Sequence, residues 1–195
     1  MKLYRPVGLK ELELILAKNA YPPRLDWQPI FYPVLNFEYA RQIATQWNLD
    51  DEFSGYAGFV TEFVVEDSYV SQFEVQNVGG ALHNELWVPA EELSRFNTHI
   101  QGKIQLSGAF YGEKYQGKIE HTKHFVGLNA KEQLVLVENW VAQQKDLTAL
   151  IQQDQIVIQT NITHWQTIQP DATALTNIRE VWPTVFPQLQ LPNEA

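Results

Sequence analysis

The chain of 195 residues contains no cysteine. This absence excludes disulfide bonds, thiolate nucleophiles and zinc sites built on cysteine. No run of apolar residues reaches membrane-spanning length, and residues 1–20 carry charges through the segment where a signal peptide would be apolar. From these features we expect a cytoplasmic protein without a membrane partner.

Positive charge is also scarce, because 14 Lys and Arg residues stand against 23 Asp and Glu residues, a net charge of −9. No basic block is present, which disfavours a nucleic-acid partner held through its phosphates. Neither a P-loop nor GxGxxG, HExxH or GxSxG occurs in the sequence. The function therefore has to be sought in individual residues rather than in a short motif.

Potential metal ligands are few. His121 and His124 have a spacing that allows a shared metal, but they stand beside Lys118 and Lys123. We interpret them as solvated loop histidines, and the run 50–52 (Asp-Asp-Glu) as a solvated surface loop. No metal site is predicted.

Hydrophobic periodicity divides residues 1–110 into strands and helices without a regular βαβ repeat. Asn36 is the predicted N-cap of the helix that follows it. The segments 30–35 and 68–73 are ambiguous, the first between strand and extended loop, the second between short helix and turn. Strands are predicted at 3–7, 59–65, 75–78, 85–88 and 104–110, and helices at 9–17, 37–47 and 89–97. This pattern predicts an α+β domain with a mixed, largely antiparallel sheet flanked by helices.

Residues 111–195 are predicted to form a small α/β C-terminal extension. A connector over 111–127 leads to a long helix from Lys131 to Gln153, for which Asn129 is a possible N-cap. Alternation then favours a strand from Gln155 to His164, and a last helix is expected from Ala172 to Val181. Because so short a segment buries little surface alone, we expect it to pack on the first domain, residues 1–110.

Two charged residues are candidates for function. Glu85 follows a glycine pair at 79–80 and begins the apolar stretch Leu86-Trp87-Val88. A carboxylate among such neighbours is partly desolvated, which strengthens the hydrogen bonds that it accepts. Arg5 stands in the first strand, where a guanidinium group can hold a phosphate or a carboxylate in a bidentate manner. The alternatives are an exposed strand residue for Glu85 and an ion pair at the edge of the core for Arg5.

Six segments of the first domain resemble a family of small bacterial proteins that are labelled as ADP-ribosylation proteins akin to J-crystallin. Among these segments are LYRPVGLKELELI, QPIFYPVLN and ELWVPAEEL. They lie at Leu3 to Ile15, Tyr21 to Leu25, Gln28 to Ala40, Ser54 to Val64, Glu85 to Leu93 and Phe96 to Ile104. J-crystallin is similar to glycohydrolases that hold magnesium through aspartates, but this chain lacks their acidic motifs.

The order of elements resembles the ADP-ribosyltransferase fold. In that superfamily a first strand offers Arg or His to NAD, a middle strand places Ser or Tyr beside the nicotinamide, and a later strand begins with a catalytic Glu. The resemblance implies that Arg5 binds NAD and that Glu85 is catalytic. Tyr56, Ser54 and Tyr32 compete for the middle position.

The resemblance further implies that NAD is the substrate, cleaved between nicotinamide and ribose. ADP-ribose would pass to water or to an acceptor, which includes a protein acceptor. The alternative function is a non-catalytic module on the same fold, which binds a protein or a small ligand through exposed aromatic residues. In a purely structural interpretation, Tyr32, Tyr56 and Trp87 fill the core.

Overall fold

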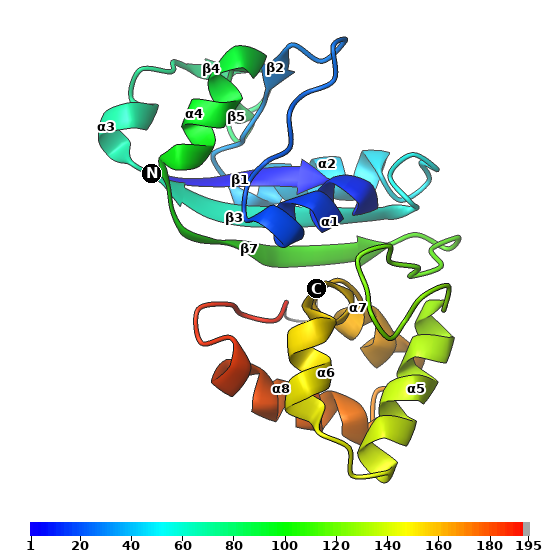
Figure 1. Cartoon of the computed structure of the whole chain (residues 1–195). Helices are drawn as coiled ribbons and strands as arrows, with labels where there is room; N and C mark the ends of the chain where they lie inside the picture. Colours follow the sequence, from blue (N-terminus) through cyan, green and yellow to red (C-terminus); the bar gives the residue numbers. More distant parts are fainter. Residues whose placement is uncertain (193–195) are drawn as a thin grey trace. The chain divides into compact units, whose positions relative to one another are not determined.

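The computed structural model describes residues 1–192, and the chain divides into two compact units, Met1–Glu113 and Lys114–Ala195 (Figure 1). The first unit combines antiparallel strands with helices, so the predicted α+β class is confirmed. Its elements are β1 (Lys2–Val7), α1 (Leu9–Lys18), β2 (Ile30–Phe31), α2 (Phe37–Trp47), β3 (Ala57–Val65), α3 (Asp67–Val70), β4 (Val75–Asn77), β5 (Asn84–Leu86), β6 (Val88–Pro89), η1 (Ala90–Glu92), α4 (Leu93–Thr98) and β7 (Ile100–Tyr111). No helix among the described residues is both long enough and apolar enough to cross a bilayer.

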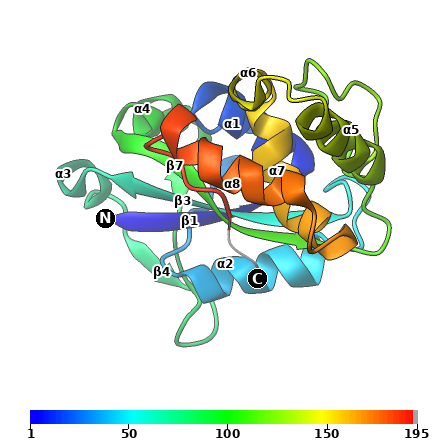
Figure 2. The ribbon, with the colours of Figure 1, turned by 90° about the horizontal axis from the view of Figure 1, so that it is seen from below.

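The central sheet has three antiparallel strands in the order β1-β3-β7. Helices α1 and α2 lie on opposite faces of this sheet (Figure 2). Successive residues of β1 therefore point to different helices. Tyr4 contacts the ring of Phe37 on the α2 side, whereas the guanidinium group of Arg5 contacts Glu11 of α1.

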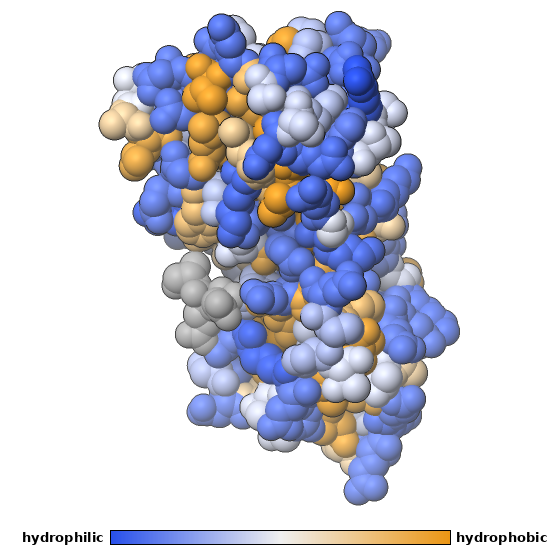
Figure 3. Space-filling model, turned by 90° about the vertical axis from the view of Figure 1, so that its left-hand side faces the viewer, coloured by the Kyte–Doolittle hydropathy of each residue, from blue (hydrophilic) through white to orange (hydrophobic). Residues whose placement is uncertain are grey.

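The short strands lie at one end of the first unit, where β2 pairs with β6 and β4 pairs with β5 (Figure 1). Hydrophobic side chains of β4 and the turn after it reach the surface, among them Val75 and Leu82. Figure 3 shows hydrophobic residues among hydrophilic ones on the surface of this side of the unit. In the segment 30–35, which the sequence left open between a strand and an extended loop, the structure has the two-residue strand β2 and a single bridging residue, Val34.

Helix α2 begins at the predicted residue. The side chain of Asn36 accepts a hydrogen bond from the backbone N–H of Tyr39, which caps the first turn. Ala40 and Ala44 are fully buried against Val60 of β3 and against Val34. These small side chains let the helix backbone approach the sheet closely, and Gly58 of β3 faces the carbonyl of Ala44.

The second unit begins with an irregular segment over 114–129, and its described elements are the helices α5 (Ala130–Ala142), α6 (Leu147–Gln153), α7 (Gln155–Ile168) and α8 (Thr173–Val185). Asn129 caps α5 as predicted, in a capping box with Glu132. The single long helix predicted from Lys131 to Gln153 is divided, because Gln144 has a φ of 54° and Asp146 caps a new helix. The expected packing of this unit on the first stays a prediction.

The strand predicted from Gln155 to His164 is wrong, because these residues belong to α7. The prediction assigned the polar residues between the isoleucines to solvent, but Gln159, Asn161 and Thr163 are buried as well. Asn161 accepts a hydrogen bond from the hydroxyl of Tyr115 at 2.5 Å and donates to the side chain of Gln133 at 2.7 Å. Helix α7 is thus buried on nearly all sides. The alternation of polar and apolar residues therefore does not show which of its side chains are exposed.

Gly58 offers a test of how tightly α2 lies on the sheet. A Cβ atom at position 58 would lie 2.1 Å from the carbonyl oxygen of Ala44, a distance that requires the helix to move. We expect Gly58→Ala to lower the free energy of unfolding by about 3 kcal/mol, as for severe overpacking. Urea denaturation measures this change. In Gly80→Ala, where the added Cβ meets only ordinary contacts, the loss should stay below about 0.5 kcal/mol.

Asp154 makes the second unit sensitive to acid. Burial alone would raise the pKa of Asp154, but hydrogen bonds from Thr122, from His124 and from the backbone N–H groups of residues 123 and 124 outweigh burial and lower it. A lowered pKa in the folded state means that ionised Asp154 stabilises the fold above a pH of about 4. This contribution is lost as the pH falls through the folded-state pKa.

We therefore expect Asp154→Asn to lower stability by about 1–3 kcal/mol near neutral pH, through loss of charge-assisted hydrogen bonds. The further loss of stability on acidification to about pH 3 should be smaller in this variant than in the wild type. Urea denaturation at both pH values checks the sign. Asp171→Asn, at an exposed position, is the matched control. An equal acid effect in wild type and Asp154→Asn would contradict the assignment.

Candidate functional site

A cavity of about 880 Å³ opens in the first unit. Four of the five residues predicted for the site line it, namely Arg5, Tyr32, Ser54 and Glu85. Tyr56 is not among its lining residues. The volume lies within the range of cavities that hold cofactors and other small ligands.

The backbone around Val34 brings Arg5 and Glu85 to this cavity. Val34 pairs with Tyr4 of β1 through two hydrogen bonds of 2.8 and 2.9 Å, and on its other side it pairs with Glu85 of β5. Hydrogen bonds from Leu86 N–H to the carbonyl of Pro33 and from Leu35 N–H to the carbonyl of Asn84 complete this pairing. Residues 33–35 therefore act as a short strand between β1 and β5, and two distant segments of the chain become neighbours.

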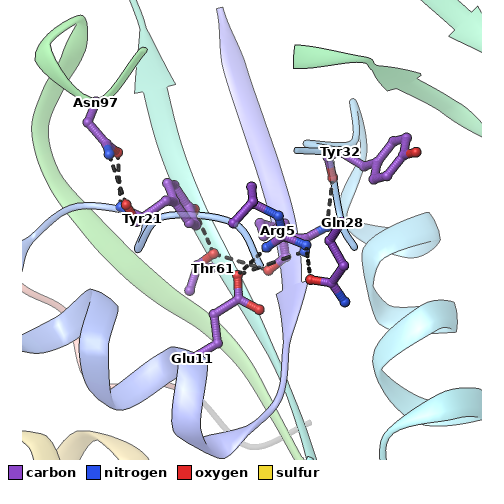
Figure 4. A network of polar contacts seen from close by, with 8 residues as sticks. Arg5, Glu11, Tyr21, Gln28, Tyr32, Thr61 and Asn97 are labelled. Carbon is purple, nitrogen blue, oxygen red and sulfur yellow. Dashed lines mark hydrogen bonds and ion pairs between the residues drawn. The ribbon is translucent and has the colours of Figure 1, made fainter. Parts of the chain in front are cut away.

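One part of the cavity is cationic (Figure 4). The guanidinium group of Arg5 donates to the carbonyl oxygen of Tyr32 at 3.1 Å and lies 3.8 Å from a carboxylate oxygen of Glu11. The same oxygen of Glu11 lies 3.4 Å from the guanidinium group of Arg24, which also donates to Gln28 at 2.7 Å. Two buried cations thus share one carboxylate. The desolvation of Arg24, followed by the charge of Arg5, lowers the pKa of its guanidinium group.

The loop after α1 holds Arg24 in this position. Both backbone groups of Tyr21 bond to the side-chain amide of Asn97, each at 2.9 Å. The hydroxyl of Tyr21 lies 2.8 Å from that of Thr61, which in turn donates to the carbonyl of Arg5. Full burial raises the pKa of Tyr21 well above its usual value. The loop is therefore fixed to the sheet next to Arg5.

Another part of the cavity contains Glu85, which is only 9% exposed. The indole N–H of Trp87 donates to one carboxylate oxygen at 2.7 Å, and the hydroxyl of Tyr39 donates to the other at 3.3 Å. Each oxygen of the carboxylate is thus oriented by an aromatic donor. Burial, and then the negative charge of Glu85, raise the pKa of Tyr39.

His83 supports this arrangement from the turn before β5. Its ring stacks on the ring of Tyr39 with a centroid distance of 4.5 Å. The Nδ1 atom accepts the N–H of Gly80 at 3.1 Å, so the proton of the neutral ring lies on Nε2 and is donated to Gln42 at 3.0 Å. His83 therefore fixes the ring that holds Glu85.

The three candidates for the middle position have different surroundings. Ser54 donates its hydroxyl to Asp51 at 2.6 Å, and this bond is the main cause of a lowered pKa of Asp51. The ring of Tyr32 contacts that of Trp87, and in Figure 4 it points away from Arg5 while its carbonyl faces the guanidinium group. Tyr56 has a φ of 58° and its carbonyl accepts the N–H of Gly112. Tyr32 and Ser54 are the two that reach the cavity.

Large aromatic residues at the cavity remain open to solvent. Trp27 is 76% exposed and Trp47 is 72% exposed, and both line the cavity. Trp87 is also an exposed lining residue. Such rings offer flat surfaces on which a planar ligand group can stack.

No protein-family model matches this chain, and neither the curated proteins nor the solved structures compared with it give a significant match. The function is therefore argued from the site itself. The predicted identity of the family stays a hypothesis.

Among the residues of this site that sequence reasoning missed are Glu11, Arg24, Tyr39 and His83. Tyr39 carried a usable signal, because Asn36 fixes the start of α2 and places Tyr39 and Ile43 one turn apart on one face. Trp87 was recognised as a neighbour of Glu85, and the period of two in a strand places both side chains on one side. Arg24 carried no comparable signal, because its position depends on the conformation of a loop.

The coupling between Tyr39 and Glu85 is testable without any ligand. We expect Glu85→Gln to lower the pKa of Tyr39, because the variant removes the negative charge that disfavours the tyrosinate. The pKa should remain above the usual value, since burial is the larger cause. NMR titration of the Tyr39 ring carbon measures it. Glu92→Gln, which acts on Tyr69, should leave Tyr39 unchanged, and an equal effect of both variants would contradict the contact.

Proposed function

We propose that this chain is an NAD-using protein with an ADP-ribosyltransferase-like site, in which Arg5 binds NAD and Glu85 is the catalytic carboxylate. The observation that carries the proposal is that Arg5 and Glu85, eighty residues apart in the sequence, line one cavity. A cation and an oriented carboxylate in one cavity suit a ligand with phosphates at one end and a ribose at the other.

The proposed reaction breaks the bond between the nicotinamide nitrogen and C1′ of the ribose. The bonding electron pair leaves on neutral nicotinamide, and positive charge builds on the ribose. Glu85 would accept a hydrogen bond from the ribose 2′-hydroxyl and stabilise this charge. The oxygen of water or of an acceptor then bonds to C1′ and loses its proton to bulk water. The donors Trp87 and Tyr39 would keep the carboxylate in a fixed orientation before the substrate binds.

The aromatic residue of the middle position would orient the nicotinamide. Tyr32 is the better-placed tyrosine, because it lines the cavity and its ring contacts Trp87 beside Glu85. Ser54 lines the same cavity, but its hydroxyl is already donated to Asp51. We therefore assign the stacking role to Tyr32 and keep Ser54 as the polar alternative.

The test is release of nicotinamide from NAD by the purified chain. We expect Glu85→Gln to reduce the rate of release by about 100-fold or more while the fold is retained, because the variant removes the charge that stabilises the ribose. Arg5→Gln should mainly weaken NAD binding. Chromatography of nicotinamide measures turnover, and calorimetric titration measures NAD binding.

Glu62→Gln is the matched control for the loss of one carboxylate. Glu62 lies on β3, pairs with Lys2 and is not a lining residue of the cavity. We expect wild-type turnover in this variant. Wild-type protein that neither binds NAD nor releases nicotinamide would refute the proposal.

The second candidate function is a non-catalytic binding module on the same scaffold. The exposure of Trp27 and Trp47 at the cavity favours it, because exposed rings of this size are typical of contact surfaces. The experiment above separates the two functions. Binding of NAD that Glu85→Gln does not affect, together with no nicotinamide release, would favour the module.

A further inference from the structure

We infer that Arg5 and Arg24 form a two-guanidinium site for a diphosphate group, with Arg24 as a ligand-binding residue in its own right. The inference deepens the proposed function and rests on it for the identity of the full ligand. The part of the inference that concerns the diphosphate depends only on the residues of the cavity. Both guanidinium groups line the cavity, and their side chains are only 12% and 9% exposed.

The charges of this cluster do not balance. Among residues 1–192, the carboxylate of Glu11 is the one that both guanidinium groups contact, and they contact the same oxygen of it. Two positive charges against one negative charge leave a net positive charge in a largely buried place. Burying an unpaired charge is costly, so an arrangement of this kind is suited to a negative ligand.

The hydrogen-bonding groups of the cluster are not exhausted either. A guanidinium group carries five N–H donors. The Nε atoms of both Arg5 and Arg24 are buried and have no partner in the described part of the chain. Apart from Glu11, the terminal nitrogens of the two guanidinium groups bond to neutral oxygens. Arg5 donates to the carbonyl of Tyr32, and Arg24 donates to the side-chain amide of Gln28. Phosphate oxygens satisfy such donors in a bidentate manner and supply the missing charge.

A diphosphate fits better than a single phosphate. The two guanidinium groups come from different segments, β1 and the loop after α1, and each is held by its own neutral partner. Each can take one phosphoryl group of a diphosphate, whereas a single phosphate that bridges both has to compete with Glu11 for the position between them. Tyr21, fixed by Asn97 and Thr61, keeps the loop in place for this purpose.

The test uses inorganic pyrophosphate and orthophosphate as probes, without NAD. We expect wild-type protein to bind pyrophosphate more tightly than orthophosphate in calorimetric titrations. Arg24→Gln should weaken pyrophosphate binding at least tenfold. Arg24→Lys keeps the charge but loses the planar set of guanidinium donors. Its affinity for pyrophosphate should lie between those of wild type and Arg24→Gln. Arg95→Gln removes the same charge at an exposed position outside the cavity and should bind like wild type.

Glu11→Gln is the most discriminating variant, because the inference predicts tighter pyrophosphate binding, whereas a purely structural role of the cluster predicts weaker binding. Glu11 competes with the ligand for both guanidinium groups, so its neutralisation should tighten pyrophosphate binding severalfold. The same variant should lower the melting temperature of the free protein, since two buried cations lose their shared carboxylate. Added pyrophosphate should raise the melting temperature of Glu11→Gln by more than it raises that of the wild type.

Several outcomes would overturn the inference. They are no pyrophosphate binding by wild type, unchanged binding in Arg24→Gln, equal weakening in Arg95→Gln, or weaker binding in Glu11→Gln. Orthophosphate binding as tight as that of pyrophosphate would contradict the diphosphate. Pyrophosphate binding without nicotinamide release would refute the proposed catalysis and support this inference. NAD turnover that Arg24→Gln leaves unchanged would support the catalysis and refute this inference.

Discussion

The candidate site depends on one backbone interaction, the pairing of Val34 with Tyr4 on one side and with Glu85 on the other. Without it, β1 and β5 have no common neighbour, and their charged residues have no reason to share a cavity. The side chain of Val34 is buried against Ala40 and Ala44 of α2, so the same residue anchors the helix that supplies Tyr39. Packing and site geometry are thus set by a single residue that carries no chemistry itself.

Arg5 and Glu85 line one cavity but form no ion pair with each other. Arg5 lies over the ring of Phe31 and bonds to the carbonyl of Tyr32 on the α1 side of the sheet. Glu85 bonds to Tyr39 of α2 and to Trp87. Glu85 is held by neutral donors, and Arg5 shares the single carboxylate of Glu11 with Arg24, so both keep charge available for a ligand. A direct pair between them would have satisfied both and left little for a substrate to bind.

The sequence predicted the elements that depend on local interactions. The cap at Asn36 predicted the start of α2, the apolar residues of 59–65 predicted β3, and the alternation of 104–110 predicted β7. Local patterns alone did not predict that Arg5 and Glu85 converge, because that depends on pairing between segments eighty residues apart; only the resemblance to the ADP-ribosyltransferase fold implied a shared site. Sequence reasoning missed Arg24, whose place depends on the anchoring of a loop by Asn97. The prediction of a strand over Gln155–His164 was wrong for another reason. Its polar residues were interpreted as an exposed face, but they are buried.

The two units differ in the charge of the buried groups that lack a hydrogen-bond partner, and this difference bears on where function lies. In the second unit, Asn161 bonds with Tyr115, Gln133 and the carbonyl of Gly117, so its side chain is satisfied by the chain itself. Asp154 likewise collects donors from the loop before α5. Among the described residues, buried donors without a partner occur in both units. In the second unit they belong to the neutral side chains of Gln159 and Trp165, whereas in the first unit they belong to the charged guanidinium groups of Arg5 and Arg24. A folded chain tolerates such a deficit where another molecule corrects it, because an unsatisfied buried charge destabilises the free protein. The unbalanced cluster, more than the size of the cavity, is therefore the reason to expect ligand binding in the first unit.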